Sequence, residues 1–368
     1  MALQKEFSCK ILDQDGSTFI IGLAPKLLKS PPSFRSRMNA GLGELVLDLN
    51  LPFDDFDEGN SIDFMNIVDV YAVDEDHPRG RRIYRGFISR YEPYIEGEEG
   101  VRVTLLGLGS LLPRTFYKNG GSFTVAHATQ DPTIIFKAII DHFGTVYGGS
   151  LITYDGSSIP ATVGQNVSIS FVDQKHFDAA KKAVELAGTG WWWSIDADGK
   201  ANMKAKPSTA THTFTLGKDI DSLSCTKDSE KIVNDVYVRR NGGTETNYID
   251  ATSQSRFGTG SPATGKISKI ISDSALTDVG AANQRGNKEL SDGKDEKIRG
   301  TITVNTNADL EAIKVGDTIK VANIRSSNNF FSDNLQIVGL TYNADSVTIE
   351  LEESSTDLGL ALDDFVNS

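Results

Sequence analysis

The stretch Gly188-Thr189-Gly190-Trp191-Trp192-Trp193-Ser194-Ile195-Asp196-Ala197-Asp198-Gly199-Lys200 predicts a helix end, a tight turn and a β-hairpin. Side chains alternate between the two faces of a strand, so Trp191 and Trp193 are expected to face one way and Trp192 the other. Asp198-Gly199 is a strong signal for a hairpin turn. These signals are local, and they fix most of the structure around the three tryptophans.

The elements on either side follow from the same kind of signal. Before the hairpin, Asp173 can cap a helix and Gly188 supplies a left-handed stop, so this helix is expected to end at Ala187. Its apolar positions recur at helical spacing: Phe177, Ala180, Val184 and Ala187. After the turn, a return strand is expected over residues 200–205, whose small or slim apolar side chains leave room for indole rings.

The three tryptophans allow two interpretations. Aromatic side chains are mostly core residues, so a hairpin packed on the preceding helix is favoured. The alternative is a carbohydrate-binding site, because an indole face can stack on a sugar ring. Trp192 lies opposite the other two, so it either covers a second buried surface, such as a subunit contact, or is available to a ligand.

Composition indicates a mainly β protein with substantial cores. A chain of 368 residues is long enough for two or three domains, and 34 glycines with many threonines, serines, asparagines and aspartates favour strands and turns over long helices. The net charge of −13 argues against a nucleic-acid-binding surface, which needs clustered lysine and arginine.

The two cysteines and the N-terminal sequence indicate a protein made and folded in a cytoplasm. Cys9 and Cys225 lie far apart, without a Cys-x-x-Cys motif or neighbouring histidines, so plain buried thiols are expected rather than a disulfide or a zinc site. The chain begins without an apolar signal segment, and no stretch approaches the length of a membrane span.

Strand patterns dominate residues 1–112, which we interpret as a first β-barrel domain. Residues 44–51 alternate leucine with mostly polar side chains, as a half-buried strand does. Antiparallel strands joined by short turns close naturally into a barrel or a sandwich. Further strands are expected over residues 67–73, 82–92 and 101–106, with turns at 77–80 and 97–100.

An α+β domain is expected over residues 113–212 and a second β-barrel domain over residues 213–345. The α+β domain holds the tryptophan hairpin and a helix opened by Asp131-Pro132 and stopped by Gly144. In the second barrel domain, residues 244–265 have the composition of a long exposed loop, and a helix is expected over residues 276–290. The remaining strands are expected over residues 231–240, 298–304, 318–324, 335–342 and 346–351.

Residues 346–368 are expected to form the last strand and an acidic C-terminal tail. From Asp345 to Ser368 there are seven acidic residues and no lysine or arginine. Such a charge run is typical of a solvated extension or of a surface that should not stick to what it faces.

Motifs of known catalytic sites are absent from the sequence. It contains no Gly-x-Ser-x-Gly elbow, no His-Glu-x-x-His helix and no phosphate-binding loop. We therefore predict that the chain is not an enzyme, with no catalytic, cofactor-binding or metal-binding residues and no cofactor. The histidines are scattered without metal-ligand spacing, and none is given a role: His77, His127, His142, His176 and His212.

Three acidic segments resemble known sites but have simpler explanations. Residues 13–17 and 196–199 resemble the start of a calcium loop, but Ala24 and Pro207 stand where such a loop needs glutamate, so hairpin turns are favoured. Residues 54–58 could hold an acid/base pair for glycoside hydrolysis. A solvated loop is favoured there, because no partner is identified.

In sequence order, these segments resemble the tail-hub family of bacteriophages and related injection machines. The resemblance covers most of the chain and its motifs are diffuse. Besides the tryptophan hairpin with its helix, they are residues 43–48 (GELVLD), 66–71 (NIVDVY), 83–93 (IYRGFISRYEP), 103–107 (VTLLG), 232–238 (IVNDVYV), 315–321 (VGDTIKV) and 336–338 (QIV).

The resemblance implies a structural virion protein, assembled in the host cytoplasm, with two tail-tube-like β-barrel domains and smaller α+β domains. Three copies would form a pseudo-sixfold ring that joins the tail tube or distal tail ring to a tail tip, spike or fibre. A tape measure protein is a further possible partner. DNA would pass through without specific binding, and the acidic charge suits a wall that repels phosphate.

The sequence leaves two other functions open. One is a carbohydrate-binding or glycan-degrading tail component that uses Trp192 and residues 54–58. The other is a distal tail ring protein, which would assemble as six copies. Many hubs continue into a lysin or receptor-binding region that this sequence lacks, so a degradative activity is not carried over.

Overall fold

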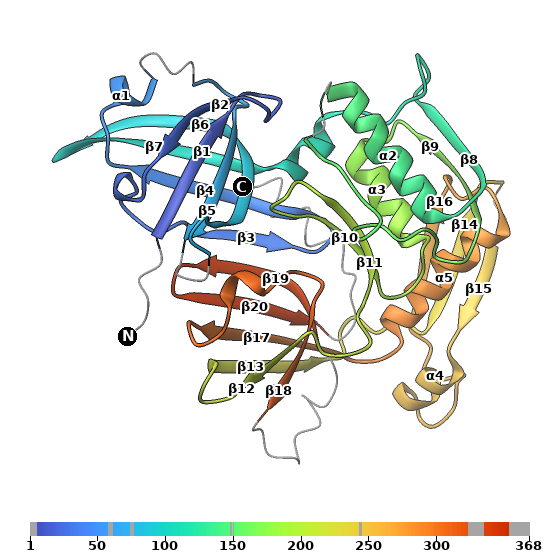
Figure 1. Ribbon diagram of the computed structural model, residues 1–368. Helices are drawn as coiled ribbons and strands as arrows, with labels where there is room; N and C mark the ends of the chain where they lie inside the picture. The colour runs from blue at the N-terminus through green and yellow to red at the C-terminus, as the bar shows by residue number, and fades with distance from the viewer. Residues whose placement is uncertain are drawn as a thin grey trace.

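The computed structural model describes residues 6–57, 62–73, 77–147, 149, 151–242, 245–322 and 335–352. Most strands gather into one large sheet, and the longer helices lie together in an α+β part beside it (Figure 1). The mainly β class expected from composition is confirmed.

The large sheet draws its strands from both ends of the chain. The order of its hydrogen-bonded strands is β13-β17-β20-β19-β3-β4-β7-β6-β5-β1-β2, with β18 paired to β19 and β12 paired to β18. The first half contributes β1 (Glu6–Leu12), β2 (Phe19–Leu23), β3 (Phe34–Arg37), β4 (Gly41–Leu49), β5 (Ile67–Val73), β6 (Arg81–Glu96) and β7 (Glu98–Gly107). The second half contributes β12 (His212–Thr215), β13 (Ile220–Asp228), β17 (Lys297–Asn305), β18 (Thr318–Ala322), β19 (Leu335–Asn343) and β20 (Ser346–Glu352).

The pairing of β3 with β19 joins the two halves into this one sheet. Phe34 lies opposite Tyr342, and their rings stack with centroids 5.2 Å apart. Over the described residues the strand ladder runs open from β13 to β2, so the two separate closed barrels expected from the sequence are not seen. Pairing across the halves satisfies strand edges that each half would otherwise have to cover alone, and both halves contribute to one hydrophobic core.

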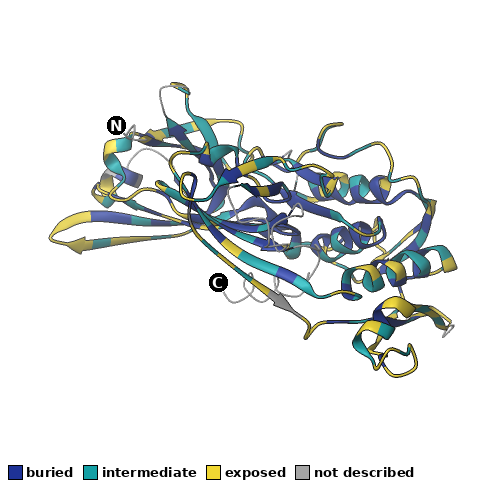
Figure 2. Ribbon diagram, turned by 90° about the horizontal axis from the view of Figure 1, so that it is seen from below, coloured by how far each residue is buried: buried dark blue, intermediate teal, exposed yellow. Residues whose placement is uncertain are grey.

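The hairpin of β6 and β7 projects beyond its neighbouring strands and ends at an exposed tip (Figure 2). The turn at Gly97, with φ of +82°, lies in the segment where the sequence predicts one. Four short helices lie in the segments that precede or follow strands of the sheet: η1 (Pro25–Leu27), α1 (Phe53–Asp57), η2 (Leu108–Arg114) and η3 (Leu310–Ala312).

The α+β part is built from two separated pieces of chain, which meet where the Ser170 amide donates to the Ala275 carbonyl at 2.9 Å and which share a second core. The first piece contributes β8 (Thr124–Gln130), α2 (Pro132–Tyr147), β9 (Val167–Val172), α3 (His176–Glu185), β10 (Trp191–Ile195) and β11 (Ala201–Ala205). The second contributes β14 (Asp235–Arg240), β15 (Glu245–Ile249), α4 (Ala251–Phe257), β16 (Ser268–Asp273) and α5 (Val279–Gly293).

The prediction of a long exposed loop over residues 244–265 is wrong. Its described residues include strand β15 and helix α4. Asp250 caps α4 by accepting a hydrogen bond from the Ser253 amide at 2.8 Å, and Tyr248 of β15 donates from its hydroxyl to Asn283 of α5 at 2.7 Å. The polar composition gave no sign of these elements, because the pairing of β15 with β14 and the anchoring of α4 through Gln254 to the Asn234 carbonyl are contacts between segments.

Several expected helix boundaries and one expected loop are also corrected. Helix α3 begins at His176 with Lys175 at the cap position and no side-chain cap, so Asp173, which has a φ of +53°, lies two residues before the cap. Helix α2 continues through Gly144 to Tyr147, and α5 runs over Val279–Gly293 rather than 276–290. The acidic run at 54–58 is not a loop but lies mostly in the short helix α1; residue 58 lies outside the described residues.

Gly286, which weakens the sequence signal for α5, is required by packing. A Cβ at this position would lie 2.3 Å from ring atoms of Tyr248. The glycine therefore allows β15 to lie directly on the helix, which offsets its low helix propensity.

We predict opposite effects for alanine at two helical glycines. Gly286→Ala loses about 1–2 kcal/mol of unfolding free energy, because the overlap with Tyr248 exceeds the gain in helix propensity. Gly144→Ala, whose Cβ would meet nothing closer than 3.4 Å, is stabilising by up to about 1 kcal/mol. Urea denaturation measures both. Equal effects would contradict the packing role of Gly286.

Candidate functional site

The tryptophan hairpin lies between the two hydrophobic cores. Residues of β10 and β11 pair as the sequence predicts, with Trp193 opposite Met203. Trp193 is fully buried in the α+β core, 6.1 Å from the ring of Phe136 on α2 and 5.4 Å from that of Phe177 on α3. The expectation that the hairpin packs on the preceding helix is confirmed.

Trp192 covers the second buried surface that the sequence left open. It is only 5% exposed and belongs to the core of the large sheet. A Cβ on Gly316, between η3 and β18, would lie 1.9 Å from the Trp192 ring, so the indole lies directly on the glycine backbone. The surface is therefore internal to the chain, and Trp192 has no free indole face for stacking on a sugar.

Asn39 ties the hairpin to the large sheet through its backbone and its side chain. Its amide donates to the Trp193 carbonyl at 2.6 Å, and its side-chain oxygen accepts from the Trp193 amide at 3.2 Å. Asn39 has a φ of +61°, a conformation that asparagine tolerates better than most residues. The hairpin is thus fixed on both faces and along one edge.

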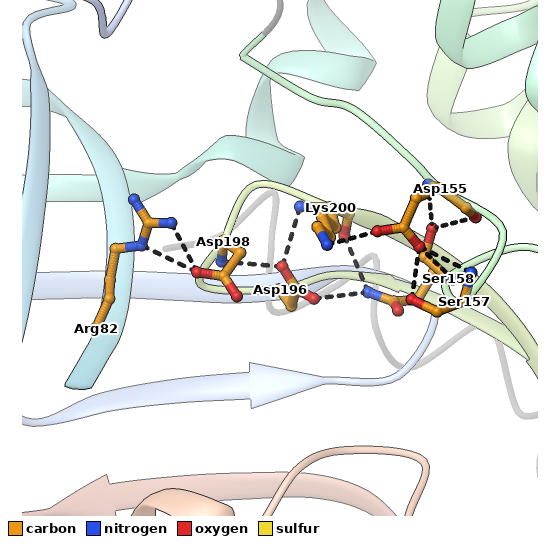
Figure 3. Close-up of polar contacts among 8 residues, drawn as sticks. Arg82, Asp155, Ser157, Ser158, Asp196, Asp198 and Lys200 are labelled. Carbon is orange, nitrogen blue, oxygen red and sulfur yellow. Dashed lines mark hydrogen bonds and ion pairs between the residues drawn. The ribbon is translucent and has the colours of Figure 1, made fainter.

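A polar network fixes the tip of the hairpin (Figure 3). Arg82 of β6 contacts Asp198 at 2.6 Å on one side and the buried Asp69 of β5 at 3.1 Å on the other. Lys200 contacts Asp155 at 2.5 Å, and this hydrogen bond holds the pKa of Asp155 well below its usual range. Asp196 accepts from backbone amides inside the turn.

The two segments that resemble calcium loops are hairpin turns, as expected. The carboxylate of Asp13 accepts hydrogen bonds from the amides of Thr18 and Ser17, which lowers the pKa of Asp13 to about 2. Asp196 plays the same part in the second turn. Among the described residues, no group of three or more histidine, cysteine or acidic side chains is arranged to hold a metal ion.

We predict that Gly316→Ala is much more damaging than Gly97→Ala. Both glycines have positive φ, +87° and +82°, so alanine costs each about 1–2 kcal/mol of backbone strain. A Cβ at Gly97 meets nothing within 4 Å, whereas at Gly316 the overlap with Trp192 adds about 1–3 kcal/mol. Thermal unfolding of the two variants tests this, and equal shifts would refute the contact.

Three of the five histidines gather around Tyr117, although their sequence spacing gives no hint of it. The Tyr117 ring lies 5.2 Å from that of His142 on α2, 5.8 Å from His176 on α3 and 6.1 Å from His127 on β8. His142 and His176 share a hydrogen bond of 2.8 Å, and the Tyr117 hydroxyl lies 3.0 Å from His127.

Burial keeps the histidine pair neutral at pH 7. It lowers the pKa of His176 to about 4, and with the charge of Lys118 it also lowers the pKa of His142. Nδ1 of His176 lies 3.0 Å from the Thr115 carbonyl, which only accepts, so it carries the proton. Nε2 of His176 then accepts from His142. The pair is a structural link between α2 and α3.

The remaining two histidines contact charged side chains, and of the two cysteines expected to be buried, Cys9 is buried but Cys225 is only half-buried. Nε2 of His212 lies 2.9 Å from Asp317, and that of His77 lies 2.8 Å from a guanidinium nitrogen of Arg81. Burial raises the pKa of Cys9 to about 12 and also raises that of Cys225. Neither thiol is therefore prepared as a thiolate nucleophile.

Acid should destabilise the protein through His176 before most carboxylates titrate. Because the pKa of His176 is about 4 when folded and about 6.5 when unfolded, the unfolded state binds more protons as pH falls between these values, so stability is lost there. His176→Gln should flatten the decline in melting temperature from pH 6.5 to 4.5. His77→Gln is the control and should keep it; an unchanged slope in His176→Gln would contradict the assignment.

Three strands of the large sheet have a single partner strand among the described residues, and the two that end its main run of strands are open to pairing; the third, β12, pairs only with β18. Strand β2 is bonded only to β1 and strand β13 only to β17 within the described part of the chain. Phe19 at the start of β2 is 58% exposed, and Ile20 and Ile21 are half-buried. Uncovered strand edges with apolar side chains are surfaces on which another chain can add a strand. They are the main candidate functional site. No helix among the described residues is long and apolar enough to cross a membrane.

Comparison with known proteins connects this fold to phage tails. Residues 207–359 match the family described as Prophage endopeptidase tail. The fold is similar to the 43 kDa tail protein of prophage MuSo2 from Shewanella oneidensis, with 15% identity, 95% of this chain and 98% of that chain covered, and a TM-score of 0.63.

Two further solved structures have the same fold. The tail protein from Neisseria meningitidis MC58 is 12% identical, and the match covers 95% of this chain and 96% of that protein with a TM-score of 0.63. Prophage tail protein gp18 from Listeria monocytogenes EGD-e has 11% identity, 99% and 100% coverage and a TM-score of 0.60. No curated protein matches the chain. The resemblance to phage tail proteins is thus confirmed at the level of fold: residues 207–359 match a prophage tail family, and the chain has the fold of solved phage tail proteins.

Proposed function

We propose that the protein is a non-enzymatic virion component, the hub of a phage tail or baseplate. Three copies form a pseudo-sixfold ring that joins the tail tube or distal tail ring to the tail tip, spike or fibre and lets DNA pass. Each copy supplies one large sheet, with strands from both halves of the chain, and an α+β part that takes residues 124–205 and also residues 235–293 of the expected second β domain. The fold of phage tail proteins supports this role.

One observation supports the ring: over the described residues, the main run of strands in the large sheet is open and ends in β2 and β13, each with a single partner strand. Two different edges, β2 and β13, can form a head-to-tail contact between neighbouring copies, and such contacts generate a ring when the rotation closes. Three copies would provide six related β halves, which matches a sixfold tube on one face and a threefold tip on the other. Charge supports the channel, because a chain of net charge −13 repels DNA phosphate.

The word endopeptidase in the matching family's description is not carried to this chain. The described residues offer no metal cluster and no thiol prepared for attack. Trp192, on which the carbohydrate-binding alternative depended, lies in the core. The hydrogen-bonded histidines link helices rather than activating a nucleophile.

The mass of the assembled protein and images of it test the ring. We expect trimers with a central channel, seen by light scattering and negative-stain microscopy, and also the protein at the tail tip of intact particles. Phe19→Lys should weaken assembly, because it places a charge on the β2 edge, while Ile270→Lys, a similarly exposed position on β16, should not. Six copies would favour a distal tail ring, and a chain that remains a monomer would refute both rings.

A further inference from the structure

The end of the β6–β7 hairpin forms an arm that extends past the rest of the sheet. Among the described residues, β5 pairs with β6 only as far as Phe87, and β4 pairs with β7 only from Val101 onward. Residues 94–100, which we call the arm tip, therefore pair only with each other. The arm tip projects beyond the neighbouring strands (Figure 2).

The base of the arm is braced, so its direction is fixed. Tyr94 donates from its hydroxyl to the carboxylate of Asp48 on β4. Lys29 and Arg102 lie over the Tyr94 ring, 4.7 Å and 5.2 Å from its centroid. A Cβ on Gly100 would lie 2.5 Å from this ring, so the tyrosine packs directly on the opposite strand. A rigid arm loses little conformational entropy when it binds.

The arm tip carries an apolar side chain in water. Ile95 is 78% exposed, the highest value among the large hydrophobic side chains that the structure describes. An exposed apolar side chain at the end of a rigid arm is suited to burial in a partner. The preceding part of β6 is less suited to adding a strand, because Pro93 has no amide proton to donate. A contact through side chains is therefore favoured.

The arm tip is acidic, and its charges lie close together. Glu96 lies opposite Glu98 across the turn, and Glu99 lies opposite Ile95. None of the three glutamates forms an ion pair with a described residue. Like charges directly opposite each other on paired strands are destabilising. A cationic surface would relieve this repulsion, so the arm tip fits an apolar pocket rimmed by lysine or arginine.

We propose that the arm tip binds a different virion protein, in the layer that adjoins the ring, through an apolar pocket rimmed by cations. The direction of this contact rests on the proposed function. When a sheet closes edge to edge into a ring, its strands run at roughly 35–45° to the axis. The arm continues the direction of β6 and β7, so it projects from one face of the ring toward the next layer.

Photo-cross-linking in intact particles tests the partner. The full chain carries p-benzoylphenylalanine in place of Ile95, and mass spectrometry identifies the linked peptide. We expect links to a virion protein other than this chain, at a segment that contains lysine or arginine. Links to a second copy of this chain, links to an acidic segment or no links would overturn the inference. The mass of the isolated assembly reports on the ring separately, because a trimer keeps the ring and a monomer refutes it.

Two isoleucine variants separate the arm contact from the ring. Ile95→Asp should lower the yield of complete particles about tenfold, because the anchor is lost, and should leave the mass of the isolated assembly unchanged. Ile249→Asp, at an exposed isoleucine of β15, is the matched control and should change neither. An unchanged particle yield in Ile95→Asp, or an isolated assembly that dissociates, would reject the proposal.

Glu98→Lys tests the charge of the pocket. A lysine opposite Glu96 replaces repulsion by attraction, so the melting temperature of the isolated protein should rise by about 1 °C. The same lysine would face the cations of the partner, so the yield of complete particles should fall about tenfold. A variant that assembles as well as the unmodified chain would contradict a cationic partner.

Discussion

The architecture depends on two neighbouring indoles that point into different cores. Trp192 fills the core of the large sheet against Gly316, and Trp193 fills the α+β core between Phe136 and Phe177. Because successive side chains of a strand face opposite sides, a register shift of one residue would exchange the two indoles between cores shaped for the other. Five residues of β10 therefore fix how the two parts of the molecule sit against each other, and the two hydrogen bonds between Asn39 and Trp193 hold the register.

The sequence could predict this hairpin because its signals are local. Alternation over three tryptophans, the Asp-Gly turn and the left-handed Gly188 each act within a few residues, and the structure has all three features. The prediction of a loop over residues 244–265 was wrong because the contacts that order this segment come from other segments of the sequence. β15 is stabilised by pairing with β14 and by the contact of Tyr248 with α5, and only the fold shows that these partners are there. The pairing of β3 with β19, which joins the two β halves, is equally non-local. No local pattern in the sequence could therefore show that the expected separate closed barrels do not form.

The same distinction applies to the candidate site. No spacing rule relates His127, His142 and His176, which come from β8, α2 and α3 and meet only around Tyr117. The residues next to Trp192 in the sequence could not show whether it lies in the core or at the surface. Gly316, against which the indole packs, is far from Trp192 in the sequence. The open edges at β2 and β13 depend on the complete strand order, which a single sequence does not give.

The ladder between β3 and β19 has a consequence for biosynthesis. β3 is made early, yet its partner leaves the ribosome only after roughly 300 more residues, about 15–60 s later at ordinary translation rates. Until then β3 lacks the strand it pairs with, and the first half lacks the apolar residues that complete its core. Nascent chains of this protein should therefore spend that interval as partly folded intermediates, which are the clients of chaperones that bind exposed strand edges.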